Sequence, residues 1–162
     1  MWIILWIVWI TQFSLKNKMF IGEYIHNLDP KRRLSIPAKF RKELGKRAVV
    51  TRGLDNCLFL YPMDEWKKVA SKLAELPTGQ KDTRSFVRLF LSGAAEVELD
   101  SLGRILLPDF LGHYSGIMGE AAIIGVFKRI EIWNKDRWES YKREVERSTD
   151  QIAEKLGEIG AY

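Results

Sequence analysis

The sequence predicts an α+β fold in which two similar units pack on one shared core with pseudo-two-fold symmetry. The first observation is a turn made twice, because LDPKRRLSIP at residues 28–37 returns as LDSLGRILLP at residues 99–108. The second is that the match continues beyond the turn, with Trp66 and Trp138 in equivalent places once a single inserted residue is allowed for. The third is size, because a unit of roughly 55 to 65 residues is only marginally stable alone.

The first unit combines short strands with short helices. Alternating side chains predict a strand ahead of the Asp29-Pro30 turn, and Pro37 suits the first turn of a short helix that Gly45 ends. Apolar residues at helical spacing, among them Trp66, predict a longer helix at the end of the unit. The expected elements, in order, are strands over 20–27 and 34–36, a helix over 38–44, strands over 48–51 and 58–61, and a helix over 62–76.

The second unit repeats this order after a polar connection that contains Pro77 and Gly79. Asn134 can cap a long C-terminal helix, whose apolar residues form a partial stripe among balanced charges. The expected elements are an amphipathic helix over 83–92, strands over 96–99 and 105–107, a helix over 108–114, strands over 121–127 and 130–133, and the long helix. We therefore expect a first domain over 19–76, a connecting segment and helix over 77–92, and a second domain over 93–162.

The first ten residues, MWIILWIVWI, are apolar throughout. They are too few to span a bilayer, which takes about 20 apolar residues, and they lack the leading positive charge and the cleavage site of a secretory signal. Because Met19 opens a stretch with the pattern of a domain start, we interpret residues 1–18 as an extension outside the fold, from a misassigned start codon. A membrane-interface or partner-binding segment is the alternative. We expect no membrane partner for the protein.

Motifs and composition argue against an enzyme. The chain offers only His26 and His113 as histidines, and it has no H-E-x-x-H, no G-x-x-x-x-G-K and no paired cysteines. The single cysteine, Cys57, lies in the apolar run CLFLY, so we interpret it as a small buried hydrophobic residue of a protein in a reducing compartment. We expect no catalytic residues, no cofactor and no metal.

Positive charge is concentrated around the first turn. The chain carries a formal net charge of +5, and between residues 31 and 47 a single acid, Glu43, stands among the cations. These cations are Lys31, Arg32, Arg33, Lys39, Arg41, Lys42, Lys46 and Arg47. Such a patch suits the phosphates of double-stranded DNA, and an arginine at a turn can reach a guanine edge in the major groove. A purely structural turn is the alternative, because an aspartate can bond its own turn and pair with an arginine four residues later.

Five stretches of the sequence together resemble the MraZ family of bacterial transcriptional regulators, across essentially all of residues 19–162. They are MFIGEY, LDPKRRLSIPAKFR, LFLYPMDEW, LDSLGRILLP and IEIW. Two D-x-x-x-R turns, each followed by apolar-x-apolar-Pro, are highly specific when both occur at this separation. The resemblance implies tandem SpoVT-AbrB-like swapped-hairpin domains and a ring-like homo-oligomer, an octamer or dodecamer. It also implies a cytoplasmic, nucleoid-associated protein that binds promoter direct repeats, usually to repress the division and cell wall gene cluster.

The family motif falls on Asp29 with Arg33 and on Asp100 with Arg104. The resemblance implies that the two arginines lie at the DNA, and that the two aspartates form the turns and orient them. The predicted DNA-binding residues are Lys31, Arg32, Arg33, Lys39, Arg41 and Arg104. We expect the first turn to carry most of the phosphate contacts, because the second turn has almost none of the surrounding cations.

The first turn departs from the family pattern at one position. The family commonly has glycine just before the motif arginine, as Gly103 does here, but the first turn has Arg32. If this position takes a positive φ, an arginine is strained there, so either the first turn has a different shape or the extra cation compensates through DNA affinity.

An AbrB-like antitoxin, or a protein-interaction module that uses the basic turn for an acidic partner, is the alternative function.

Overall fold

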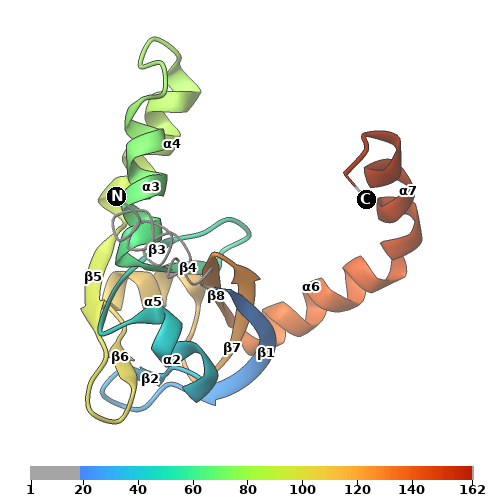
Figure 1. Cartoon of the computed structure of the whole chain (residues 1–162). Helices are drawn as coiled ribbons and strands as arrows, with labels where there is room; N and C mark the ends of the chain where they lie inside the picture. Colours follow the sequence, from blue (N-terminus) through green and yellow to red (C-terminus); the bar gives the residue numbers. More distant parts are fainter. Residues whose placement is uncertain (1–18, 162) are drawn as a thin grey trace, which may run out of the picture.

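The computed structural model of the protein describes residues 19–161 and has an α+β architecture (Figure 1). The expected extension over residues 1–18 lies outside the described residues. The first half contains β1 (Phe20–Asn27), β2 (Arg33–Ser35), α2 (Ala38–Leu44), β3 (Arg47–Arg52), β4 (Leu58–Pro62), α3 (Met63–Ala74) and α4 (Lys81–Ser92). The second half contains β5 (Ala95–Glu98), β6 (Arg104–Leu106), α5 (Asp109–Ser115), β7 (Glu120–Phe127), β8 (Arg129–Asn134), α6 (Lys135–Arg147) and α7 (Thr149–Glu158).

The two halves follow the same predicted order of strand, turn, strand, helix, two strands and helix. The short helices confirm the interpretation of their boundary residues, because α2 follows Pro37 and ends at Gly45, and α5 follows Pro108 and ends at Gly116. Proline fits the first turn of a helix because its missing N–H would have no partner there, and glycine ends a helix at little steric cost.

The strands of the two halves are interleaved in one antiparallel sheet of order β1-β7-β8-β4-β3-β5. Strand β1 pairs with β7 of the second half, and β5 pairs with β3 of the first. A second, two-stranded sheet takes β2 from one half and β6 from the other. Each half therefore gives its first strand to the other, as expected of swapped hairpins, and neither half closes a sheet by itself.

The strand registers confirm the pseudo-two-fold symmetry. In the centre of the large sheet Phe59 faces Glu131 across β4 and β8, and in the small sheet Leu34 faces Ile105. Both pairs join equivalent residues of the two repeats, so the symmetry axis passes through both sheets. The prediction of one inserted residue in the second half is wrong in detail. The strand registers make Ala48 equivalent to Ala121, so the second half has two extra residues before β7. The β7–β8 turn is one residue shorter than its counterpart in the first half, so one extra residue remains at β8.

The large sheet is covered on both faces. On one face the β2–β6 sheet and helices α2 and α5 enclose a core shared by both halves, in which the Phe40 ring packs edge-on against Phe20 and Tyr24. On the other face α3 and α6 cover a second cluster, with Trp66 and Trp138 packed against it. Cys57 is 1% exposed in this second cluster, and burial raises the pKa of its thiol to about 12, which confirms its interpretation as a buried hydrophobic residue.

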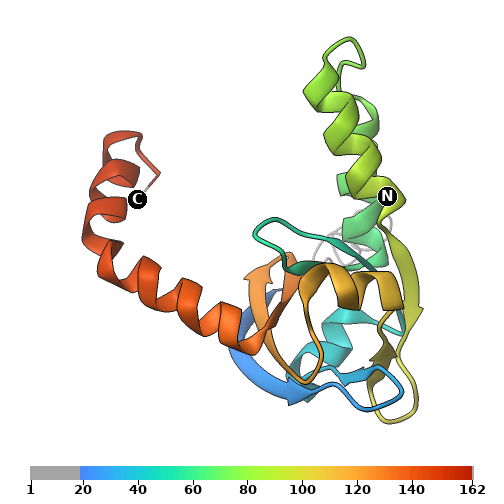
Figure 2. The ribbon, with the colours of Figure 1, turned by 180° about the vertical axis from the view of Figure 1, so that it is seen from behind.

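Two helical arms project from the sheets (Figures 1 and 2). Helices α3 and α4 form a hairpin, whereas α6 and α7 extend on another side of the molecule. The predicted single C-terminal helix is wrong, because the chain breaks at Ser148 between α6 and α7. The hydroxyls of Ser148 and Thr149 both donate to the Val145 carbonyl, and such side-chain bonds compete with the helical hydrogen bonds.

Candidate nucleic-acid interface

The Asp29 carboxylate organises the first turn. Its Oδ1 accepts hydrogen bonds from the backbone N–H groups of Lys31 (2.8 Å) and Arg33 (2.9 Å), and its Oδ2 accepts one from Arg33 Nε (2.6 Å). The backbone closes the same turn, because the Asp29 N–H donates to the Arg33 carbonyl at 3.0 Å. One carboxylate therefore holds both the backbone of the turn and the direction of the Arg33 side chain.

The second turn repeats this arrangement around Asp100. Its Oδ1 accepts from the N–H groups of Leu102 and Arg104, both at 2.9 Å, and its Oδ2 accepts from Arg104 Nε at 2.8 Å. Arg104 has two carboxylates near it, because its Nη2 lies 2.7 Å from Asp100 Oδ2 and its Nη1 lies 3.9 Å from Asp29 Oδ2. The two turns therefore have the same shape, but they leave their arginines with different freedom.

The two motif arginines lie on the outer face of the β2–β6 sheet. Leu34 and Ile105 point into the core and are fully buried, so Arg33 and Arg104, one residue away on each strand, point outward. Their side chains are 35% and 24% exposed, and Arg104 Nη1 lies 3.9 Å from Asp29 Oδ2. The small sheet thus brings both D-x-x-x-R turns to one end of the molecule, opposite the α3–α4 hairpin (Figure 1).

Hydrogen bonding to the arginines keeps both aspartates ionised. The backbone and side chain of Arg33 lower the pKa of Asp29, and the side chain and backbone of Arg104 lower the pKa of Asp100 to about 2. A carboxylate that accepts several hydrogen bonds favours its charged form. Each arginine is therefore paired with a negative charge, and the four motif side chains together carry no net charge.

We expect Asp100 to stabilise the fold at neutral pH and to lose this effect in acid. Because its pKa is lowered from 3.8 to about 2 in the folded state, its contribution is complete above pH 3.8 and disappears as the pH falls to about 2. Urea unfolding of the wild type and of Asp100→Asn over this range checks the expectation. The difference in the free energy of unfolding should shrink toward pH 2, and a difference that does not change with pH would contradict it.

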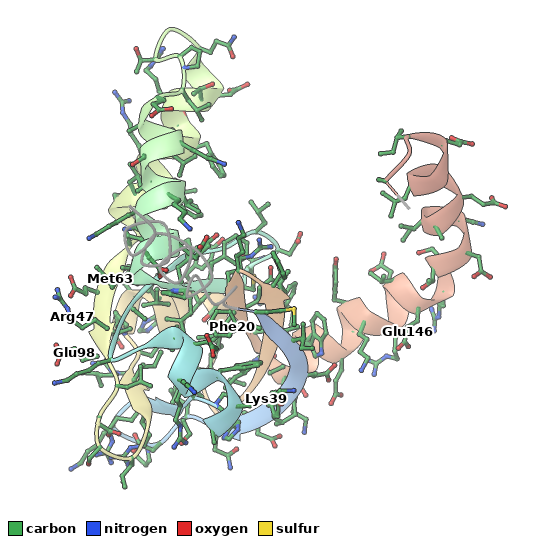
Figure 3. The ribbon with its side chains drawn as sticks, in the orientation of Figure 1. Phe20, Lys39, Arg47, Met63, Glu98 and Glu146 are labelled. Carbon is green, nitrogen blue, oxygen red and sulfur yellow. The ribbon has the colours of Figure 1, made fainter. Side chains whose placement is uncertain are left out.

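The net positive charge near the turns comes mainly from lysines, with Arg41 beside the second turn. Lys31, beside the first turn, and Lys39, on α2 (Figure 3), are exposed and have no ion pair among residues 19–161. The same holds for Lys42 and Lys46, while Arg47 pairs with Glu96. The lysines can therefore attract phosphates without first giving up a partner, whereas the motif arginines are held in fixed directions.

Arg32 occupies the position where the second turn has Gly103. Both residues have a left-handed backbone, with φ of 59° and 74°, and each N–H donates to the carbonyl of its turn aspartate. The first turn therefore does not differ in shape, and Arg32 is held in a conformation that costs a non-glycine residue about 1 kcal/mol or more. Its Nη1 lies 2.5 Å from Asp109 Oδ1, at the start of α5 in the other half.

Arg41 lies at the equivalent contact of the second turn. A Cβ added at Gly103 would collide with the Arg41 guanidinium, whose Nε donates to the Ile36 carbonyl at 2.8 Å. In the repeat, the residue equivalent to Arg41 is Gly112. The sequence predicted Arg32 and Arg41 as DNA-binding residues but missed their inter-half contacts and the role of Asp109. The alignment of the two repeats could have indicated these contacts. At the turn position and at the helix position alike, one half has arginine where the other has glycine.

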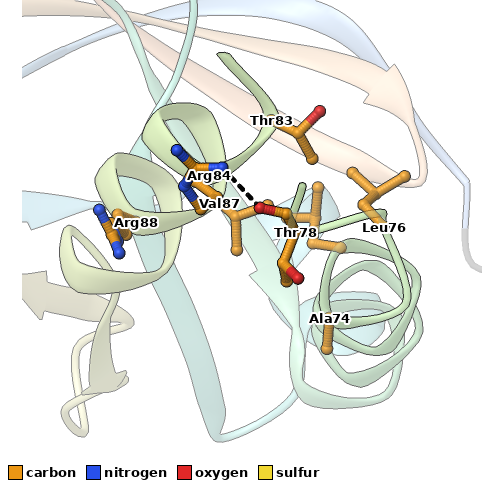
Figure 4. Close-up of a pocket in the computed structure, with 8 residues that line it drawn as sticks. Ala74, Leu76, Thr78, Thr83, Arg84, Val87 and Arg88 are labelled. Atoms are coloured by element: carbon orange, nitrogen blue, oxygen red, sulfur yellow. Dashed lines mark hydrogen bonds between the residues drawn. The ribbon is translucent and has the colours of Figure 1, made fainter. Parts of the chain in front are cut away.

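Two open cavities adjoin the turns: one of about 480 Å³ is lined in part by Arg32 and one of about 350 Å³ in part by Asp100. Another, of about 240 Å³, lies between α3, α4 and their connection, where Arg84 donates to the Thr78 carbonyl at 2.7 Å (Figure 4). It is lined mainly by apolar side chains such as Leu76 and Val87. Between Met19 and Ala161, no three His, Cys, Asp or Glu side chains are grouped so that they could hold a metal ion. Over the same stretch, no helix is both long and apolar enough to cross a membrane.

Comparisons with known proteins agree with the geometry. Residues 19–89 and 90–158 each match the family model described as "MraZ protein, putative antitoxin-like". A transcriptional regulator MraZ of Alkaliphilus oremlandii is 54% identical over 142 residues, which are 88% of this chain and 99% of that protein. Proteins of the same name from Clostridium beijerinckii and Syntrophomonas wolfei are 53% and 52% identical over the same shares. Their named role is regulatory and not enzymatic, and the chain belongs to the MraZ family of transcriptional regulators.

Proposed function

We propose that this regulator binds double-stranded DNA in a sequence-specific manner through its two D-x-x-x-R turns. The observation that carries the proposal is that the two Asp-held arginines, Arg33 and Arg104, lie diagonally across from each other on the outer face of one two-stranded sheet. A two-stranded ribbon fits the major groove of B-DNA, where arginine is the commonest partner of guanine. An arginine held by a carboxylate loses little freedom on binding, which favours affinity.

The charged groups around the turns divide into two roles. The hydrogen bond from Arg33 to Asp29 uses Nε, which leaves the two terminal nitrogens of Arg33 to contact a base edge. Exposed lysines beside the turn, Lys31 and Lys39, contact phosphates and supply affinity that does not depend on sequence. Arg104 has a second carboxylate, Asp29, near it and a smaller exposed fraction, so it contributes less to base contact than Arg33.

The regulator acts as a repressor at direct repeats in the promoter of the division and cell wall gene cluster, as a cytoplasmic, nucleoid-associated protein. It does so as a ring-like homo-oligomer, an octamer or dodecamer. Support comes from the helical arms, because α3, α6 and α7 contain no buried residue, and Phe86, Leu89 and Ile152 expose apolar surface on α4 and α7. Several turns presented on one assembly bind repeats about one helical turn apart with a gain in effective concentration.

Binding to the protein's own upstream DNA tests this proposal. We expect the chain starting at Met19 to bind that DNA more tightly than scrambled DNA of equal length, with an affinity that falls steeply as salt is raised. Fluorescence anisotropy over a salt series measures both properties, and light scattering of the same samples reports the oligomer. Equal affinity for the two DNAs would mean that the protein has only a basic surface that binds DNA without sequence preference.

An antitoxin-like or protein-binding role is the second candidate, favoured by the description of the matching family model. In that case the basic turn binds an acidic protein partner. The same measurement separates the two functions, because a protein-binding module has no preference for the upstream repeats. Absence of binding to either DNA would favour the acidic partner.

A further inference from the structure

Each recognition turn is attached to the opposite half of the chain through the residue before its motif arginine. The carbonyl of Arg32 accepts a hydrogen bond from the Leu107 N–H, and the carbonyl of Gly103 accepts one from the Ile36 N–H, both at 2.9 Å. These bonds join the first turn to the second half and the second turn to the first half. The orientation of each turn therefore depends on a contact across the pseudo-two-fold axis.

An arginine side chain lies at each of these two backbone bonds. At one it belongs to the turn, and at the other it belongs to the helix of the opposite half. At the first turn the arginine is Arg32 on the turn, which pairs with Asp109 of α5. At the second turn the arginine is Arg41 on α2, and its guanidinium occupies the space that a side chain at Gly103 would need. The helix position that corresponds to Arg41 is Gly112, so each pair of equivalent turn and helix positions holds one arginine and one glycine, although a Cβ at Gly112 would lie near Ile117 and Leu107 and not near Arg32.

We infer that Arg32 and Arg41 are positioning residues that brace the two recognition turns, and that Asp109 holds Arg32 in this role. The inference rests on the proposed DNA binding and deepens it. It reassigns two predicted DNA contacts, so that Arg33, Arg104 and the neighbouring lysines contact DNA while these two arginines set the angle of the turns. It also assigns a function to Asp109, a residue that the motif does not contain.

The geometry favours a brace over a phosphate contact at Arg32. The residue is fixed at three points: its N–H bonds Asp29, its carbonyl bonds Leu107, and its guanidinium pairs with Asp109. A strained left-handed conformation persists in a non-glycine residue only when its surroundings determine it in this way. If Arg32 served a phosphate instead, Asp109 would be a competitor for it, and the two roles predict opposite effects of removing Asp109.

The decisive measurement is the ratio of affinities for the upstream repeats and for scrambled DNA. For Asp109→Asn we expect this ratio to fall about three- to fivefold, the size of effect that loss of an exposed ion pair produces. The lost negative charge raises binding to both DNAs alike, so it cancels in the ratio. Asp109 also lies 3.5 Å from His113 Nδ1. Glu23→Gln is the control, because Glu23 is an exposed carboxylate in an ion pair with Lys142 of α6, and its ratio should not change.

Moving the arginine from the first turn to helix α5 tests whether it positions the turn or contacts DNA directly. Arg32→Gly should lower the ratio without lowering the thermal midpoint, because glycine relieves the left-handed strain. The double variant Arg32→Gly with Gly112→Arg should restore the ratio, because it gives the first turn the arrangement of the second. A Cβ at Gly112 has its nearest neighbours at 3.9 Å, which is ordinary van der Waals contact, and the same variant removes the Arg32 side chain beside α5.

The outcomes distinguish this inference from the proposed function. A higher ratio for Asp109→Asn, or no recovery in the double variant, would show that Arg32 contacts DNA directly and would overturn the brace. An unchanged ratio for Asp109→Asn would also overturn it. If the wild-type protein itself showed no preference for the repeats, the proposed function would fail before any variant was compared.

Discussion

Replacing Arg33 with alanine is expected to remove most of the preference for the upstream repeats while leaving the fold intact. A good arginine–guanine contact contributes about 1 to 3 kcal/mol of discrimination, which corresponds to a loss of roughly fivefold to 150-fold for each engaged turn. Stability should change little, because Asp29 keeps its hydrogen bonds from the backbone N–H groups of Lys31 and residue 33. Anisotropy titrations on both DNAs and thermal denaturation measure the two effects separately.

Arg147→Ala is a suitable control for this experiment. Arg147 is an exposed arginine in the last turn of α6, on a helical arm and away from both turns. Its removal lowers the net charge by the same amount, so it accounts for any general loss of attraction to DNA. Equal losses of binding in the two variants, or a loss of stability in Arg33→Ala as large as its loss of binding, would contradict a recognition role.

Replacing Phe40 with alanine is expected to have the largest effect on stability. Its ring is 1% exposed and packs against Phe20 and Tyr24 at centroid distances of 5.5 and 5.2 Å. Removing a buried phenylalanine costs about 3 to 5 kcal/mol through lost burial and the cavity left behind. This is a large share of the roughly 5 to 15 kcal/mol that holds a typical domain folded. Denaturant unfolding followed by circular dichroism gives the free energy of unfolding.

The matched control is Phe110→Ala in α5. Phe110 occupies the second position of its helix and is 45% exposed, so its removal should cost about 1 kcal/mol or less. A similar loss in the two variants would mean that α2 does not depend on its contact with the shared core. Because the core is formed by both halves, we expect the Phe40 variant to lose the whole structure in one transition.

In the proposed DNA-binding role, the two Asp–Arg pairs carry no net charge, so other cations must attract the DNA. Asp29 and Asp100 neutralise their arginines and fix their directions, while exposed lysines supply positive charge. Lysines therefore attract the DNA, while the motif arginines are held in fixed directions. An arginine that already has a fixed direction gives selectivity, whereas a free lysine gives affinity for any sequence.

Features that depend on neighbouring residues can be predicted from the order of residues alone. Alternation and helical spacing predict the strands and helices, and Pro37 and Gly45 mark the limits of α2. The Asp29 turn is also local, because its hydrogen bonds reach only to residue 33. The repeat relates the residues of the two halves directly, so the order of residues alone indicates two equivalent units and one symmetry axis.

Contacts between the two halves of the chain could be identified only in the folded structure. Local patterns cannot distinguish β1 paired with β7 from β1 paired within its own half, and the swapped pairing came only from the family resemblance. The break at Ser148 depends on side-chain bonds to carbonyls that compete with a regular helix. The contact of Arg32 with Asp109 joins residues far apart in sequence. It forms because the interleaved strands place the first turn over α5, and no local propensity encodes that placement.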